Sequence, residues 1–140
     1  MIAYRLVNEA YDSVIPGGLL KRTSDNSNQK FGPGTYFFLD RDDAFQFLQS
    51  KSGYSYTHLI KCDIEGCDRE RFVDLIAQPN LISRWRNVRN ISSIRKATPE
   101  YCREHNFYGI IISLQRWREL MLLEEFTNTP IHILEAERLS

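Results

Sequence analysis

The chain lacks a net charge and a long apolar run, and each absence argues against a class of protein. Its 18 basic residues balance its 18 acidic ones, so no overall positive field is available to hold a polyanion. Nucleic acid is therefore disfavoured as the main partner, although a nucleic-acid acceptor stays open. The longest apolar run, 109–112, is far shorter than the roughly 20 residues of a membrane-spanning helix, and no basic-then-apolar leader opens the chain. We expect no membrane partner and no secretion.

Cysteine is scarce, and its spacing predicts no structural role. The chain has three cysteines, Cys62, Cys67 and Cys102, which are odd in number and form no C-x-x-C pair. This pattern predicts neither a disulfide framework nor a zinc site. The three histidines are isolated from one another in the sequence and add no metal-ligand spacing. We therefore expect a cytoplasmic protein without a bound metal.

No repeat, low-complexity tract or linker divides the 140 residues, which predicts one domain over 1–140. Apolar alternation and β-branched or aromatic residues predict strands over 2–7, 35–38, 56–64, 71–75, 107–114, 119–126 and 130–136. Helices are expected over 41–51 and 81–88. A third is expected from Thr98 to about 105, with Pro99 at its first position. Strands and helices are segregated, so the fold class is α+β.

The most informative segment is Phe31-Gly32-Pro33-Gly34-Thr35-Tyr36-Phe37-Phe38. Two glycines around a proline predict a tight turn whose backbone can approach a ligand closely. The aromatic and β-branched residues that follow predict a strand. Asp40 is placed to cap the next helix, with two acids in its first turn.

Two other strands carry charges in apolar surroundings. Arg5 lies in the middle of the short apolar strand near the amino terminus, where a charge is costly unless it meets an anion or a buried acid. Glu119 directly precedes the apolar stretch Leu120-Met121-Leu122-Leu123. Glu124 and Glu125 follow on the same expected strand and are the rival acids, although their place near its far end suits a solvent-facing role.

Arg5, the Gly-Pro-Gly-Thr-Tyr-Phe segment and Glu119 occur in the order that the ADP-ribosyltransferase superfamily shows, and the chain resembles that superfamily. The resemblance implies two small β-sheets clasping an NAD cleft, with about three helices. It implies that Glu119 is the catalytic carboxylate that reaches the nicotinamide ribose, and that no metal is needed. The implied NAD-binding residues are Arg5, Gly34, Thr35, Tyr36 and Phe45; Phe47 is the alternative to Phe45 as the second wall of the nicotinamide slot.

Three departures from the family pattern make the chain a divergent, stand-alone member. It has no Ser-Thr-Ser motif, and Trp117 stands two residues before Glu119, where the arginine-modifying branch has Glu or Gln. Arginine is therefore disfavoured as the acceptor. The dipeptide Arg5-Leu6 stands where the His-type branch of the superfamily has His-Gly. The chain length and the segment 107–110, which precedes the motif around Glu119, are similar to those of short phage-encoded ADP-ribosyltransferases that disarm bacterial immunity.

The resemblance implies a mono-ADP-ribosyltransferase that uses NAD to modify a macromolecule, with a protein favoured. One alternative is an NAD glycohydrolase toxin on the same scaffold, with water as the acceptor. Another is a catalytically silent domain that binds NAD, ADP-ribose or a protein. The basic run with Arg84, Trp85, Arg86 and Arg89 is either a solvated face or a docking surface for an acidic protein or nucleic acid.

Overall fold

The computed structural model describes residues 1–20, 30–50, 55–114, 116–126 and 128–140. Within these residues the fold is α+β, with seven strands and three α-helices. The strands are β1 (Ile2–Val7), β2 (Gly34–Phe38), β3 (His58–Ile64), β4 (Phe72–Asp74), β5 (Gly109–Leu114), β6 (Trp117–Leu123) and β7 (Ile131–Arg138). The helices are α1 (Arg41–Ser50), α2 (Leu81–Arg89) and α3 (Ile94–His105), with short 3₁₀ turns at Arg69–Arg71 and Glu124–Phe126.

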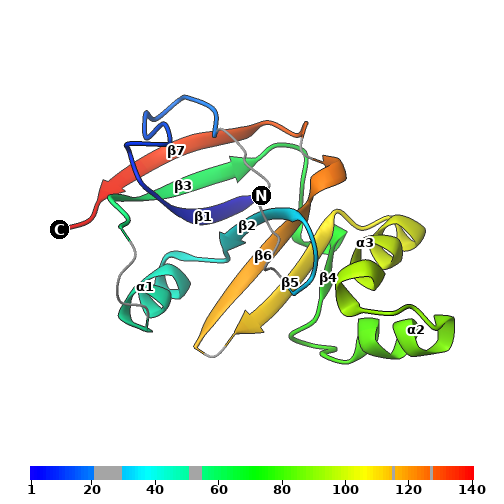
Figure 1. Cartoon of the computed structure of the whole chain (residues 1–140). Coiled ribbons are helices and arrows are strands. Elements are labelled where there is room, and N and C mark those ends of the chain that lie inside the picture. Colours follow the sequence, from blue (N-terminus) through cyan, green and yellow to red (C-terminus); the bar gives the residue numbers. More distant parts are fainter. Residues whose placement is uncertain (21–29, 51–54, 115, 127) are drawn as a thin grey trace.

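All seven strands form one sheet, in the order β4-β5-β6-β2-β1-β3-β7. Figure 1 shows that β1, β3 and β7 form one group and the other four strands a second group at an angle to it. The groups are joined by a single residue pair, Tyr4 of β1 with Phe38 of β2. The expected pair of separate sheets is therefore corrected to one sheet, because this pair continues the ladder from β1 into β2.

The main core lies between the two strand groups. It takes Ala3, Ile60 and Ile133 from the first group, and Phe37 and Leu120 from the second, all at most 1% exposed. These side chains alternate along their strands with residues of the outer surface, as the pleat of a strand requires. The halves of the sheet therefore cover each other's inner surfaces.

Helices cover the outer surface of the second group. α2 and α3 pack on β4, β5 and β6, where Ile82 and Tyr101 meet Ile110 and Met121. The remaining helix, α1, packs beside Phe38 and against the start of β6, at the junction of the two groups. None of the helices in the described part of the chain has the length and apolar character needed to span a bilayer.

The start of α3 differs from the expectation. The helix begins at Ile94, and the side chain of Ser93 caps it by accepting from the Lys96 amide at 3.2 Å. Thr98 lies inside the helix, where its hydroxyl donates to the Ile94 carbonyl, and Pro99 follows it there. Burial of the helix face that packs on the sheet outweighs the backbone donor that proline removes.

α1 is fixed to the sheet by the capping acid that the sequence predicted and by a second acid. Asp40 Oδ1 accepts from the Asp43 amide at 3.1 Å, and Asp43 Oδ2 accepts from the Asp40 amide at 3.2 Å. Asp43 is buried, and its carboxylate also accepts from the backbone and guanidinium of Arg118 on β6. The helix was expected to reach Lys51, which lies outside the described residues; it is described as far as Ser50.

We expect Asp43→Ala to lower the free energy of unfolding by about 2–3 kcal/mol, because it removes a helix cap and leaves Arg118 without its buried partner. Urea denaturation measures this loss. The matched control is Asp42→Ala in the same helical turn, whose side chain is exposed; it should change stability by about 0.5 kcal/mol or less. Equal effects of the two changes would contradict a docking role for Asp43.

Candidate functional site

A cavity of about 360 Å³ opens at the junction between the two strand groups. Its volume is within the range of roughly 300–1,000 Å³ that is typical of small-molecule sites. Four of its seven lining residues are aromatic, and one cation and one carboxylate also line it. The lining residues are Arg5, Leu6, Tyr36, Phe38, Phe47, Tyr56 and Glu119.

The register of the strands brings these residues together. Glu119 of β6 pairs directly with Phe38 of β2, so both side chains lie on the same face of the sheet. Tyr36 precedes Phe38 by two residues and shares that face. Arg5 enters from β1, next to the point where β1 and β2 are no longer paired. Three residues that are far apart in sequence therefore border one cavity.

Arg5 bridges the gap between β1 and β2. Its Nη1 donates to the Tyr36 carbonyl at 2.7 Å, and its guanidinium carbon lies 6.0 Å from the centre of the Phe37 ring. Its Nε is buried without a hydrogen-bond partner, and no ion pair forms between Arg5 and the described residues. Burial lowers the pKa of Arg5 below its usual value. The side chain is a half-buried cation with donors still to be satisfied.

Glu119 is a half-buried carboxylate, and among the described residues one hydrogen bond holds it. The indole Nε1 of Trp117 donates to Glu119 Oε2 at 3.0 Å. Burial raises the pKa of Glu119 above its usual value, and the bond from Trp117 partly opposes that rise. Trp117 is 4% exposed, and its ring meets Phe47 edge to face at 5.4 Å between centroids.

Tyr36 presents a neutral phenol to the cavity. Its hydroxyl donates to the Gly32 carbonyl at 3.1 Å. Burial raises the pKa of Tyr36 well above its usual range, and the charge of Glu119 raises it further. On another side of the cavity lie Phe47 of α1 and Tyr56, whose ring centroids are 6.2 Å apart and whose ring planes make an angle of 58°. The aromatic walls suit a flat ring as ligand.

Three of the expected NAD-binding residues do not reach this cavity. Gly34 lies against β6, where an added Cβ would come within 2.5 Å of the Leu122 carbonyl oxygen, so it permits strand packing. Thr35 is 2% exposed and belongs to the opposite face of β2, because side chains alternate along a strand. Phe45 lies under the guanidinium of Arg41 at 4.5 Å, whereas Phe47 is the α1 phenylalanine that lines the cavity.

The rival acids lie elsewhere. β6 ends at Leu123, and Glu124 and Glu125 occupy the 3₁₀ turn that follows, so their expected place on the strand is corrected. Glu125 accepts from Arg103 of α3 at 3.3 Å, and both acids are exposed. They border a separate, more open cavity of about 440 Å³. The cation of that cavity is Arg103, which is already paired with Glu125.

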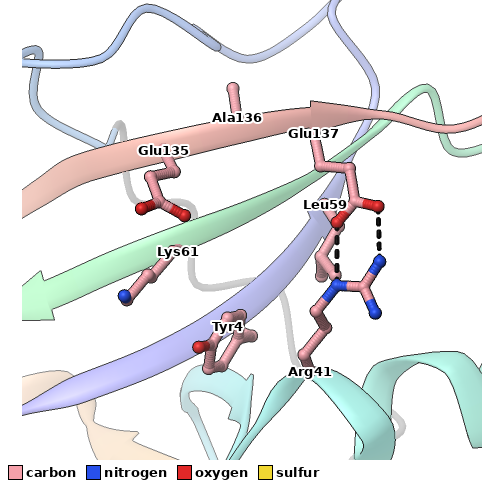
Figure 2. A pocket seen from close by; sticks show the side chains of 7 residues that line it. All are labelled: Tyr4, Arg41, Leu59, Lys61, Glu135, Ala136 and Glu137. Atoms are coloured by element: carbon pink, nitrogen blue, oxygen red, sulfur yellow. Dashed lines mark hydrogen bonds and ion pairs between the residues drawn. The ribbon is translucent and has the colours of Figure 1, made fainter.

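A third cavity, of about 160 Å³, lies on the outer surface of β1, β3 and β7 (Figure 2). Arg41 of α1 binds both carboxylate oxygens of Glu137 on β7 there, at 3.0 and 2.6 Å. This pairing lowers the pKa of Glu137. Arg41 and Glu137 satisfy each other, and Lys61 lies opposite Glu135 on the neighbouring strand. The cavity therefore has two cations and two carboxylates, and no excess of positive charge for an anionic ligand.

The basic run forms contacts within the molecule. Arg89 pairs with Glu104 of α3 at 2.7 Å and lies over the ring of Trp85, which packs edge to face on Tyr101. Arg86 donates to the backbone of the loop between the two helices. Trp85 is therefore a half-buried packing residue, while Arg84 and Arg89 are both exposed cations of the helix.

Sequence reasoning did not assign a role to Tyr56 or recognise Trp117 as the partner of Glu119. The second could have been found from the strand period, because residues two apart on β6 share a face. Among the described residues no group of three His, Cys, Asp or Glu side chains is placed to hold a metal ion. The chain matches no protein-family model, no curated protein and no solved structure.

Proposed function

We propose that the protein is a mono-ADP-ribosyltransferase that uses NAD as its substrate and modifies a macromolecule, with a protein as the favoured acceptor. The observation that supports this proposal is the meeting of Arg5, Tyr36 and Glu119 at one cavity. These residues come from β1, β2 and β6, which are widely separated in sequence. They are also the residues at which the sequence resembles the ADP-ribosyltransferase superfamily.

In the proposed reaction the bond between ribose C1′ and the nicotinamide nitrogen breaks, and its electron pair leaves with the nicotinamide, which becomes neutral. Positive charge develops on the ribose. Glu119, when ionised, stabilises that charge and accepts a hydrogen bond from a ribose hydroxyl. The acceptor's nucleophilic atom forms the new bond to C1′ and releases its proton to solvent.

The other cavity residues supply binding and orientation. The rings of Tyr36 and Phe47 provide apolar surfaces for the nicotinamide. The guanidinium charge of Arg5, which lines the cavity, suits the negatively charged pyrophosphate or the ribose. The volume of about 360 Å³ suits the nicotinamide ribose end, with the rest of NAD extending outward.

Incubation with NAD labelled on its adenylate part, with and without a cell lysate, tests this proposal. A labelled macromolecular band is the expected result, and protease or nuclease treatment identifies its class. Free ADP-ribose without a labelled band would indicate the glycohydrolase. Binding of NAD without either product would indicate a silent binding domain, and either result would overturn the transferase.

We expect Arg5→Ala to weaken NAD binding by about tenfold or more, because a half-buried cation that faces the cavity is lost. The free energy of unfolding should fall by less, about 1 kcal/mol, since the bond from Arg5 to the Tyr36 carbonyl is also removed. Titration calorimetry and thermal unfolding measure the two effects. Arg5→Lys should restore part of the affinity through charge alone. Unchanged NAD affinity together with a large loss of stability would make Arg5 a structural residue.

A further inference from the structure

The hydrogen bond between Trp117 and Glu119 lies directly beside the proposed reaction centre. The indole Nε1 of Trp117 donates to Oε2 of Glu119 at 3.0 Å, while Oε1 accepts no hydrogen bond from a described residue. We propose that Trp117 is a positioning residue, which holds Oε2 so that Oε1 is available to the ribose hydroxyl. The catalytic part of this inference rests on the proposed function.

Trp117 is suited to this role because its own position is fixed by packing. It is 4% exposed and belongs to the cluster that joins α1 to the sheet, with Leu6, Phe38 and Ala44. Phe47 meets its ring edge to face. A buried indole has few rotamers open to it, so its N–H points in one direction. A carboxylate bound to it loses the freedom to turn away from the cavity.

The same bond favours the charged form of the carboxylate. Burial raises the pKa of Glu119, and the bond from Trp117 lowers it. The other polar groups that face the cavity are Arg5 from β1, Tyr36 from β2 and Tyr56 from the segment before β3, while α1 contributes only Phe47. Arg118 is next in sequence but is bound to Asp40 and Asp43 at the start of α1. Trp117 is therefore the neighbour that holds Glu119 through a direct hydrogen bond.

Nuclear magnetic resonance tests the bond in the intact protein without reference to activity. The chain has two tryptophans, so an ¹⁵N spectrum shows two indole signals, which Trp117→Phe and Trp85→Phe assign. The Trp117 signal should shift with pH as Glu119 titrates, and the shift should disappear in Glu119→Gln. Trp85 packs on Tyr101 and does not line this cavity, so Glu119→Gln should leave its signal unchanged. A Trp117 indole signal whose position does not change as Glu119 titrates would overturn the proposal.

Kinetics then test the consequence for catalysis. Trp117→Phe keeps an aromatic ring but removes the donor, so the pKa of Glu119 should rise. The acidic limb of the kcat profile, where activity falls as Glu119 takes up a proton, should move to higher pH. The plateau of kcat should fall by about tenfold with little change in KM. Trp85→Phe is the matched control and should leave both unchanged.

The outcomes separate this inference from the proposed function. A loss of activity in Trp117→Phe without a shift of the acidic limb would overturn the positioning role, since a packing defect has that effect. If the unaltered protein cleaves no NAD, the proposed function fails, and the catalytic part of this inference with it. The indole titration would still decide whether Trp117 holds Glu119.

Discussion

Glu119→Gln is expected to reduce the turnover of NAD by roughly a hundredfold or more, while the affinity for NAD changes little. The substitution keeps the size and shape of the side chain and removes only its charge. In the proposed reaction the ionised carboxylate matters most when positive charge develops on the ribose, so its loss should appear in kcat and not in binding. Single-turnover release of nicotinamide and calorimetry with NAD measure the two quantities.

The same substitution should not destabilise the fold. Burial raises the pKa of Glu119 in the folded protein, so between the unfolded and folded pKa values the folded state binds more protons. Stability therefore decreases as pH rises through this window, and above it the ionised carboxylate is a cost to the folded state. Glu119→Gln removes that cost. We expect a thermal unfolding temperature at neutral pH equal to or above that of the unaltered protein.

Two nearby acids serve as matched controls. Glu124→Gln and Glu125→Gln make the same chemical change, but both residues lie in the turn after β6, beside another cavity. Their turnover should be close to that of the unaltered protein. Full activity of Glu119→Gln together with inactivity of either control would mean that the catalytic carboxylate has been assigned to the wrong residue.

The local fold could be read from the sequence where side-chain alternation and capping agree. The strand over 2–7 is confirmed as β1, and Asp40 caps α1 as expected. The apolar strand after Phe107 is confirmed as β5, with its first four residues buried. In each case a short segment contains its own signal, because a helix cap or a buried strand depends on a few neighbouring residues.

The arrangement of the strands was harder to predict. The sheet continues from β1 to β2 through the pair Tyr4–Phe38, and no feature of the sequence at either residue predicts that pairing. Likewise Ser93, and not Thr98, caps α3, since the helix face packed on the sheet reaches back to Ile94. Both outcomes depend on tertiary contacts that local propensity does not contain.

For the candidate site, sequence reasoning selected the three polar residues that meet at the cavity, but not the surrounding wall. Thr35 was grouped with Tyr36, although adjacent residues of a strand face opposite sides. The choice between Phe45 and Phe47 depended on which face of α1 meets β6. The contacts of Asp43 with Arg118 set that orientation, and they are visible only in three dimensions.

Gly109→Ala is expected to cost about 3 kcal/mol or more of folding free energy, measured by urea denaturation. An added Cβ would overlap the carbonyl oxygen of Met121 on β6 and come within 3.2 Å of the Phe72 ring on β4. Relief requires β5 and β6 to separate, because the obstacle is backbone. That movement would disturb the register that places Glu119 beside Ile112, so turnover of NAD should fall as well.

Gly17→Ala is the matched control, since the same methyl group is added where nothing lies within 4 Å. Gly17 has φ of +88°, so alanine there carries only a backbone penalty of about 1 kcal/mol. The difference between the two variants then isolates the steric cost of the close approach of β5 to β6. Equal losses of stability would show that the strands can adjust to a side chain at position 109, and that this approach does not fix the position of Glu119.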